Sequence, residues 1–312
     1  MSLNKPNEKI DWGIKKKDEV IEVVENLGDV LKSGNVDDVS KILQDKQLLR
    51  SFVIQKGEGG KNLQYLNELV DFVIKDEFGQ NADILDIEGE KLISLLHERE
   101  IPEQVLGEML SSAYHMHDRI KFFRIYSVIM ENSEKLHNKE LIEFANHDLA
   151  SWYGSVEKDS DKSQKLNKEV LDSAKMKDLK IIATKAKFGI TFNRDLKPKE
   201  KAQGFAEIRE SMEAVEHHYD AHRARIEEIK ALVELASRQK SQNEKEMRFE
   251  NIDRAIALSK EVLDYAIKSG YSNLEVLARE AQALIAKETG DIRRSEQFSE
   301  KARELKEKYL YK

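Results

Sequence analysis

A long internal repeat constrains the fold of this chain more than any local motif. Residues Leu274 to Ile292 align with Leu179 to Leu196, and the paired positions carry small or apolar side chains at the same places. The pentapeptide KEVLD precedes both copies, at 168–172 and at 260–264. Self-similarity at such a long period is typical of stacked helical hairpins. We therefore expect an array of helix pairs.

Weaker copies extend the repeat in both directions. Steps of 38 residues back from the Leu179 copy reach 141–154 and then the stretch around Gly107, and a forward step reaches 226–235. The alignments predict five first helices, near residues 107, 145, 183, 226 and 278. Each is followed by a predicted second helix, at 120–136, 162–175, 199–217, 250–268 and 293–309. One hairpin cannot bury its apolar face alone, so neighbouring units are expected to stack and share a core.

The pattern divides the chain into three parts. Residues 1–16 are polar and are expected to form a flexible lead-in, residues 17–80 form an N-terminal helical module, and residues 81–312 form the array of about five hairpins. The Gly-rich stretch 56–62 lacks the spacing of a phosphate-binding loop. We expect it to be a connector.

Composition narrows the fold class and the partners. Ala, Leu, Glu, Lys and Ile recur throughout while alternating β-branched stretches are scarce, so the predicted fold class is all-α. A net charge of -7, from 52 basic and 59 acidic residues, disfavours nucleic acid as the partner. No apolar stretch has the length of a membrane span or the position of a signal-peptide core, so we expect a cytoplasmic protein without a membrane partner. The absence of Cys excludes disulfides and thiolate catalysis.

The last unit resembles a tetratricopeptide repeat. The residues that carry the resemblance lie at that family's spacing in the first helix, the turn and the second helix: Ala278, Ala281, Ala283 and Ile285, then Gly290 and Asp291, then Ser295, Phe298 and Ala302. The resemblance covers residues 102–312 and, more faintly, 17–54. It implies an α-solenoid, a right-handed superhelix whose first helices line a concave groove that holds an extended peptide or a helix.

The resemblance also indicates which residues face the groove, on the exposed side of each first helix. The candidate peptide-binding residues are His147, Lys185, Asn193, Glu228, Glu280 and Lys287. Their mixed charge suggests a polar peptide. The leading hypothesis is a non-enzymatic adaptor or scaffold that binds a protein or peptide segment and uses no cofactor.

Two alternative functions stay open. The first is a peptide-responsive bacterial regulator that acts through the N-terminal helical module, although the sequence shows no convincing basic recognition helix. The second is a metal-dependent enzyme at His218 and His222, whose spacing places both on one helical turn and can chelate a metal ion. No nucleophile elbow, dinucleotide fingerprint or calcium loop is present, so catalysis is not expected.

An aromatic cluster permits two interpretations. Phe122, Phe123, Tyr126, Trp152 and Tyr153 could form a cage around a ligand or pack between units. Other repeats carry Ile and Leu at these places, so packing in the core is the preferred interpretation.

Overall fold

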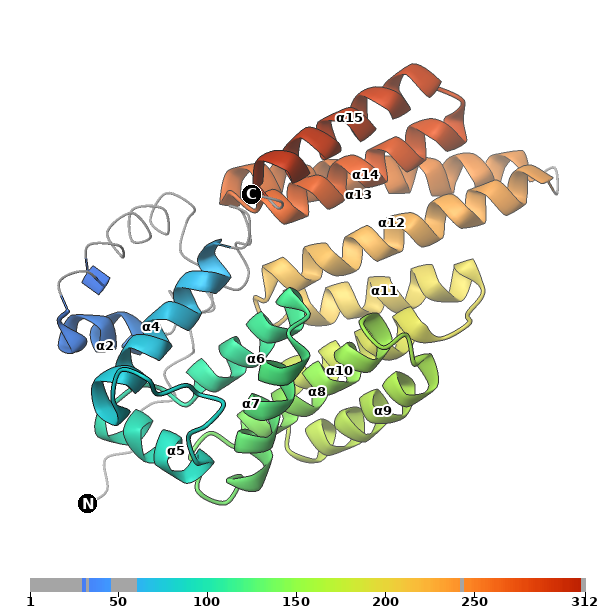
Figure 1. Cartoon of the computed structure of the whole chain (residues 1–312). Helices are drawn as coiled ribbons and strands as arrows, with labels where there is room; N and C mark the ends of the chain where they lie inside the picture. Colours follow the sequence, from blue (N-terminus) through green and yellow to red (C-terminus); the bar gives the residue numbers. More distant parts are fainter. Residues whose placement is uncertain (1–29, 32–33, 46–60, 242–243, 310–312) are drawn as a thin grey trace, which may run out of the picture.

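The computed structural model describes residues 30–31, 34–45, 61–241 and 244–309, and every regular element among them is a helix (Figure 1). The all-α prediction is therefore confirmed. In chain order the helices are α2 (Val36–Gln44), α4 (Lys61–Phe78), α5 (Gly89–Glu98), α6 (Gln104–Met116), α7 (Arg119–Glu131), α8 (Glu140–Ser155), α9 (Ser160–Met176), α10 (Lys180–Asn193), α11 (Pro198–Glu213), α12 (His218–Ser241), α13 (Lys245–Ser269), α14 (Ser272–Thr289) and α15 (Ile292–Tyr309). The predicted lead-in 1–16 and most of the Gly-rich stretch 56–62 lie outside the described residues.

The predicted helix pairs correspond to helices of the structure. The five first helices are α6, α8, α10, α12 and α14, and the five second helices are α7, α9, α11, α13 and α15. Each first helix packs against its second helix, and α6 packs on α8, α8 on α10, and α12 on α14. Three predicted ends are wrong by four or five residues: α7 stops at Glu131 and not at Leu136, α11 stops at Glu213 and not at His217, and α13 begins at Lys245 and not at Glu250. At the end of α7 the side chain of Asn132 donates a hydrogen bond to the Val128 carbonyl (2.9 Å) and caps the helix.

Local sequence explains where several helices begin and end. Asp118 and Asp159 stand at N-caps, and their carboxylates accept the backbone N–H three residues on, at 3.0 and 2.9 Å. α14 ends at Gly290, whose φ of +85° is a conformation that glycine adopts without a steric penalty. Ala278 and Ala281 are fully buried and allow α14 to approach its neighbours closely.

The apolar interior is divided into two large clusters. The N-terminal core runs from α2 to α8 and is rich in Leu, Ile, Val and aromatic residues. The C-terminal core runs from α11 to α14 and is rich in Ala. Only smaller apolar clusters lie between them among the described residues. The described residues of the predicted N-terminal module contribute Val39, Leu43 and Leu66 to the N-terminal core, so they pack against the helices that follow.

The aromatic cluster belongs to the N-terminal core. Trp152 stacks on Phe122 with ring centroids 4.5 Å apart, and both side chains are buried. The indole N–H of Trp152 donates to the Glu157 carboxylate at 3.1 Å, so its polar atom is satisfied. Core packing, and not a ligand cage, is confirmed for this pair.

Candidate functional site

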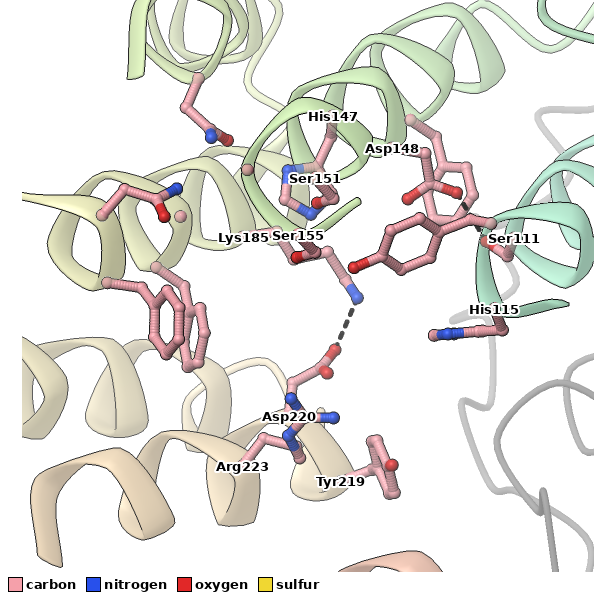
Figure 2. A pocket seen from close by; sticks show the side chains of 18 of the residues that line it. Ser111, His115, His147, Asp148, Ser151, Ser155, Lys185, Tyr219, Asp220 and Arg223 are labelled. Atoms are coloured by element: carbon pink, nitrogen blue, oxygen red, sulfur yellow. Dashed lines mark hydrogen bonds and ion pairs between the residues drawn. The ribbon is translucent and has the colours of Figure 1, made fainter. Parts of the chain in front are cut away.

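A pocket of about 290 Å³ opens between four successive first helices, α6, α8, α10 and α12 (Figure 2). Its side chains are mostly polar and include both signs of charge. The principal lining residues are Ser111, Tyr114 and His115 of α6, Phe144, His147, Asp148, Ser151 and Ser155 of α8, Lys185, Phe188, Phe192 and Asn193 of α10, and Tyr219, Asp220 and Arg223 of α12. The pocket therefore joins three consecutive helix pairs and the start of a fourth.

The packing of α12 explains why the pocket forms here. α6, α8 and α10 pack on one another in sequence, but α12 packs chiefly on α11 and α13 and has no close packing against α10. The two large apolar cores also end on either side of this point. Polar side chains of α10 and of the first turns of α12 line the space that is left.

An ion pair crosses the pocket from α10 to α12. The Lys185 ammonium lies 2.8 Å from a carboxylate oxygen of Asp220, and Figure 2 shows the two side chains pointing toward each other. His217 approaches the same oxygen, also at 2.8 Å. The side chains of Lys185 and Asp220 are only 16% and 19% exposed, so this pair is less screened by solvent than a surface ion pair.

The guanidinium of Arg223 enters the pocket and forms no ion pair with a residue that the structure describes. Among the residues that the structure describes, no carboxylate lies within ion-pair distance of Arg223, and its Nε is a buried atom without a hydrogen-bond partner. Burial alone would lower the pKa of Arg223, but the Tyr219 hydroxyl, Asp220 and Glu227 outweigh it and raise the pKa above its usual value. The group is a permanent cation, and a ligand carboxylate or phosphate would satisfy it.

His147 supplies a neutral hydrogen-bonding group. Burial, followed by the charge of Lys185, lowers the pKa of His147 to about 4, while Asn167 and Asp220 act in the opposite direction. The imidazole is therefore uncharged at neutral pH. It can donate or accept one hydrogen bond in the pocket, and it does not act there as a cation.

One wall of the pocket is apolar. Phe188 and Phe192 lie one turn apart on α10 with nearly parallel rings, 6.3 Å between centroids, and Phe192 is 52% exposed. Gly189 lies between them and lets α10 approach α9, because an added Cβ would stand 2.7 Å from the Asn167 side chain. The two phenyl rings give an apolar side chain of a ligand a surface to pack on.

Three of the six candidate groove residues meet in this pocket. His147, Lys185 and Asn193 all line it. Asn193 also links α10 to α9, because its side-chain amide donates to the Ser163 hydroxyl at 2.9 Å. Its place in the pocket is therefore set by the packing of α10 on α9.

The other three candidates lie elsewhere. Glu228 is not on an exposed face, because its side chain is 0% exposed. It forms ion pairs with Arg254 and, at 3.5 Å, with Arg209. Burial raises the pKa of its carboxyl group. Glu280 pairs with Lys306 of α15 at 2.6 Å, on the side of α14 that faces the last helix. Lys287 is exposed in the last turn of α14. None of the three lines the pocket.

Sequence reasoning missed Tyr114, Asp148, Asp220 and Arg223 as residues of the site. A signal for the pocket was present in the sequence. Polar or small residues recur every four positions along the lining helices, at 111 and 115, at 147, 151 and 155, at 185, 189 and 193, and at 219 and 223. A stripe of this period on successive first helices marks one shared face.

The alternative site at His218 and His222 is not arranged for a metal ion. His222 is buried, its ring stacks on Tyr265, and both ring nitrogens lie within 3.3 Å of the Arg225 guanidinium. Burial, and next the charge of Arg225, lower the pKa of His222 to about 3. His218 is exposed. The positive charge of the Arg225 guanidinium beside His222 would repel a metal ion bound between the two histidines.

Comparison with known proteins does not assign the site. The chain matches no model of a protein family, and no curated protein matches it at a significant level of similarity. Among the described helices, none is both long and apolar enough to cross a bilayer. The functional argument therefore depends on the chemistry of the pocket.

Proposed function

We propose that this protein is a non-enzymatic binding protein whose pocket holds one segment of a peptide or protein, with an acidic group of that segment at Arg223. The Arg223 guanidinium carries the proposal, because among the described residues no carboxylate forms an ion pair with it. A ligand carboxylate would supply that ion pair and add charge-assisted hydrogen bonds. The bidentate fork of arginine suits a carboxylate.

The size of the pocket favours part of a longer ligand. Sites that enclose whole small molecules occupy about 300–1,000 Å³, and this pocket is just below that range at about 290 Å³. One or two side chains of a peptide fill such a volume. The rest of the peptide would then lie along the neighbouring first helices.

The lining matches the different parts of a peptide. The Phe188 and Phe192 rings accept an apolar side chain, and the hydroxyls of Ser151 and Ser155 can bond to its backbone. Asp148 and the Lys185–Asp220 pair keep the pocket from being strongly positive. This charge balance selects against ligands with many acidic groups.

For the whole molecule we propose a right-handed, tetratricopeptide-like superhelix in the cytoplasm, with the pocket on its concave face. Support comes from the order of packing, since α6, α8 and α10 follow one another and all line the pocket. Such an array holds its side chains in place before the ligand arrives, which reduces the entropy lost on binding.

Selection of peptides from a random displayed library on the immobilised full chain tests the proposal. We expect enriched peptides that share an acidic residue next to an apolar one and bind with a Kd of about 1–100 μM. Arg223→Gln should weaken binding at least tenfold, and Ser151→Trp should block it by filling the pocket. Lys287→Glu, a charge reversal outside the pocket, is the matched control and should bind like the parent chain.

Circular dichroism melts of each variant establish that the fold is kept. The proposal is contradicted if no peptide is enriched. It is also contradicted if the enriched peptides bind to the Arg223→Gln and Ser151→Trp variants as tightly as to the parent chain. Loss of binding in Lys287→Glu alone would place the groove along α14, away from this pocket.

A further inference from the structure

A cluster of His97, Glu103 and His137 lies away from the pocket, at the other end of α6 and α8. His97 is in the last turn of α5, Glu103 is the N-cap residue of α6, and His137 is in the connection from α7 to α8. Three segments that are separate in sequence thus place two imidazoles around one carboxylate. Within the part of the chain that the structure describes, this is the group of His and acidic residues whose potential ligand atoms converge, all within 4.8 Å of one another.

The carboxylate of Glu103 is buried and held in place. Its side chain is 6% exposed, and its two oxygens accept the backbone N–H groups of His137 and Asn138 at 2.9 and 2.7 Å. Each carboxylate oxygen has two lone pairs, so Oε1 keeps one directed toward the histidines. In metal sites the ligating carboxylates are themselves held by hydrogen bonds, and the two backbone N–H groups hold the Glu103 carboxylate in this way.

The two imidazoles lie on the same side of that oxygen. Nε2 of His97 is 2.7 Å and Nδ1 of His137 is 3.8 Å from Oε1, and the rings stack with centroids 4.5 Å apart. The side chain of His137 is 82% exposed, so its ring can turn about its side-chain bonds without disturbing the core. The nearby Lys139 ammonium bonds to the Ser133 carbonyl at 2.7 Å, which directs it to the loop backbone.

We propose that His97 Nε2, His137 Nδ1 and a carboxylate oxygen of Glu103 bind Zn²⁺ or a similar divalent transition-metal ion. Zinc takes nitrogen and carboxylate ligands at about 2.0–2.2 Å in a tetrahedron, so its ligand atoms lie roughly 3–3.5 Å apart. The His97–Glu103 separation needs to widen by about 0.5 Å, and the ring of His137 turns inward to meet the ion. A water molecule completes the tetrahedron on the exposed side of His137.

The set of donor atoms decides the class of ion. Calcium and magnesium prefer oxygen ligands, and here two of the three donors are imidazole nitrogens. Imidazole with one carboxylate suits zinc, and copper and nickel compete for the same donors. The bound ion would join the end of α5, the start of α6 and the α7–α8 connection, and so stabilise the N-terminal core without contact with the pocket.

Titration calorimetry of the full chain, made without a polyhistidine tag and freed of metal with a chelator, tests the site with ZnCl₂ alone. We expect one ion per chain with a Kd of about 1 μM. The melting temperature should rise by about 5 °C when zinc is a hundredfold above Kd. His97→Asn and His137→Asn should each weaken binding at least tenfold.

His117→Asn is the control, because His117 is another exposed histidine and its left-handed backbone conformation tolerates Asn. Nitrogen NMR of the histidine rings should show zinc on Nε2 of His97 and Nδ1 of His137. The proposal is overturned if no 1:1 binding saturates below about 100 μM zinc, or if His137→Asn binds like the parent. It is also overturned if His218→Asn removes the binding. Because the side chain of His137 is exposed, the His137→Asn variant should fold even if variants of the buried Glu103 do not.

Discussion

The two cores of this protein solve the same packing problem with different side chains. The N-terminal core fills the space between helices with large residues, of which Trp152 stacked on Phe122 is the clearest example. The C-terminal core brings helix backbones close together over small residues such as Ala255, Ala278 and Ala281, which are fully buried. The N-terminal core is stabilised by large side chains that fill the space between helices, and the C-terminal core by small side chains that let helices approach closely. The stability of the N-terminal core should therefore be most sensitive to smaller side chains, and that of the C-terminal core to larger ones.

The largest effect is expected from removal of volume in the N-terminal core. Trp152→Ala deletes an indole that is 1% exposed, leaves a cavity and should lower the free energy of unfolding by about 3–5 kcal/mol. Urea denaturation followed by circular dichroism measures it. Met176→Ala, at an exposed position, is the control and should change stability by less than about 0.5 kcal/mol. A loss below about 1 kcal/mol in Trp152→Ala would mean that this core does not depend on filled volume.

The next effect is expected from added volume in the C-terminal core. Ala281→Leu puts three more carbon atoms where α14 meets its neighbours and should lower the free energy of unfolding by about 1–3 kcal/mol, because the backbones must separate. The same substitution at Ala257, which is exposed on α13, should be nearly neutral. If Ala281→Leu were neutral or stabilising, close approach of the helices would not be what holds this core together.

The smallest effect, counted per pH unit, is a dependence of stability on pH that two buried histidines cause. Folded-state pKa values of about 4 for His147 and about 3 for His222 lie below the usual 6.5 of an unfolded histidine. The unfolded chain therefore binds more protons, and stability falls as the pH drops from 6.5 toward those values, by at most about 1.4 kcal/mol per pH unit for each histidine. His147→Gln should remove part of that slope between pH 6.5 and 4, and His222→Gln between pH 6.5 and 3.

Urea midpoints measured at half-unit steps of pH give these slopes. Each variant is compared with the parent chain, so that the carboxylates, which titrate in both, cancel in the difference. His218→Gln is the control, because His218 is an exposed neighbour. Equal slopes for the parent and the His147 variant would show that His147 is protonated equally easily in the folded and unfolded chains.

Much of the fold could be predicted because the relevant information is local. Small residues at matching positions, such as Ala183 and Ala278, and caps such as Gly290 identify helices and turns from a few residues of sequence. The ends of helices were less predictable. The cap at Asn132 depends on one side-chain hydrogen bond, which the apolar spacing of α7 does not reveal.

The pocket could be predicted only in part because it depends on contacts between distant helices. Lys185 was identified from its position on a first helix, but its partner Asp220 is on α12, 35 residues later. Glu228 occupies a similar position on its own helix and is nevertheless buried, because Arg209 and Arg254 of the two flanking helices enclose it. Helical period alone does not distinguish an exposed carboxylate from one that is paired in the interior.

The stacking of Trp152 also has a spectroscopic consequence. The chain has two tryptophans, Trp12 and Trp152, so Trp12→Phe leaves a single indole emitter. That emitter is shielded from water in the N-terminal core, and its ring lies 6.4 Å from Tyr114, a residue of the pocket wall. Fluorescence from an indole in this position has a blue-shifted maximum, and its intensity responds to changes at Tyr114. The protein thus contains an intrinsic optical reporter next to its pocket, and ligand titrations can be followed without an added dye.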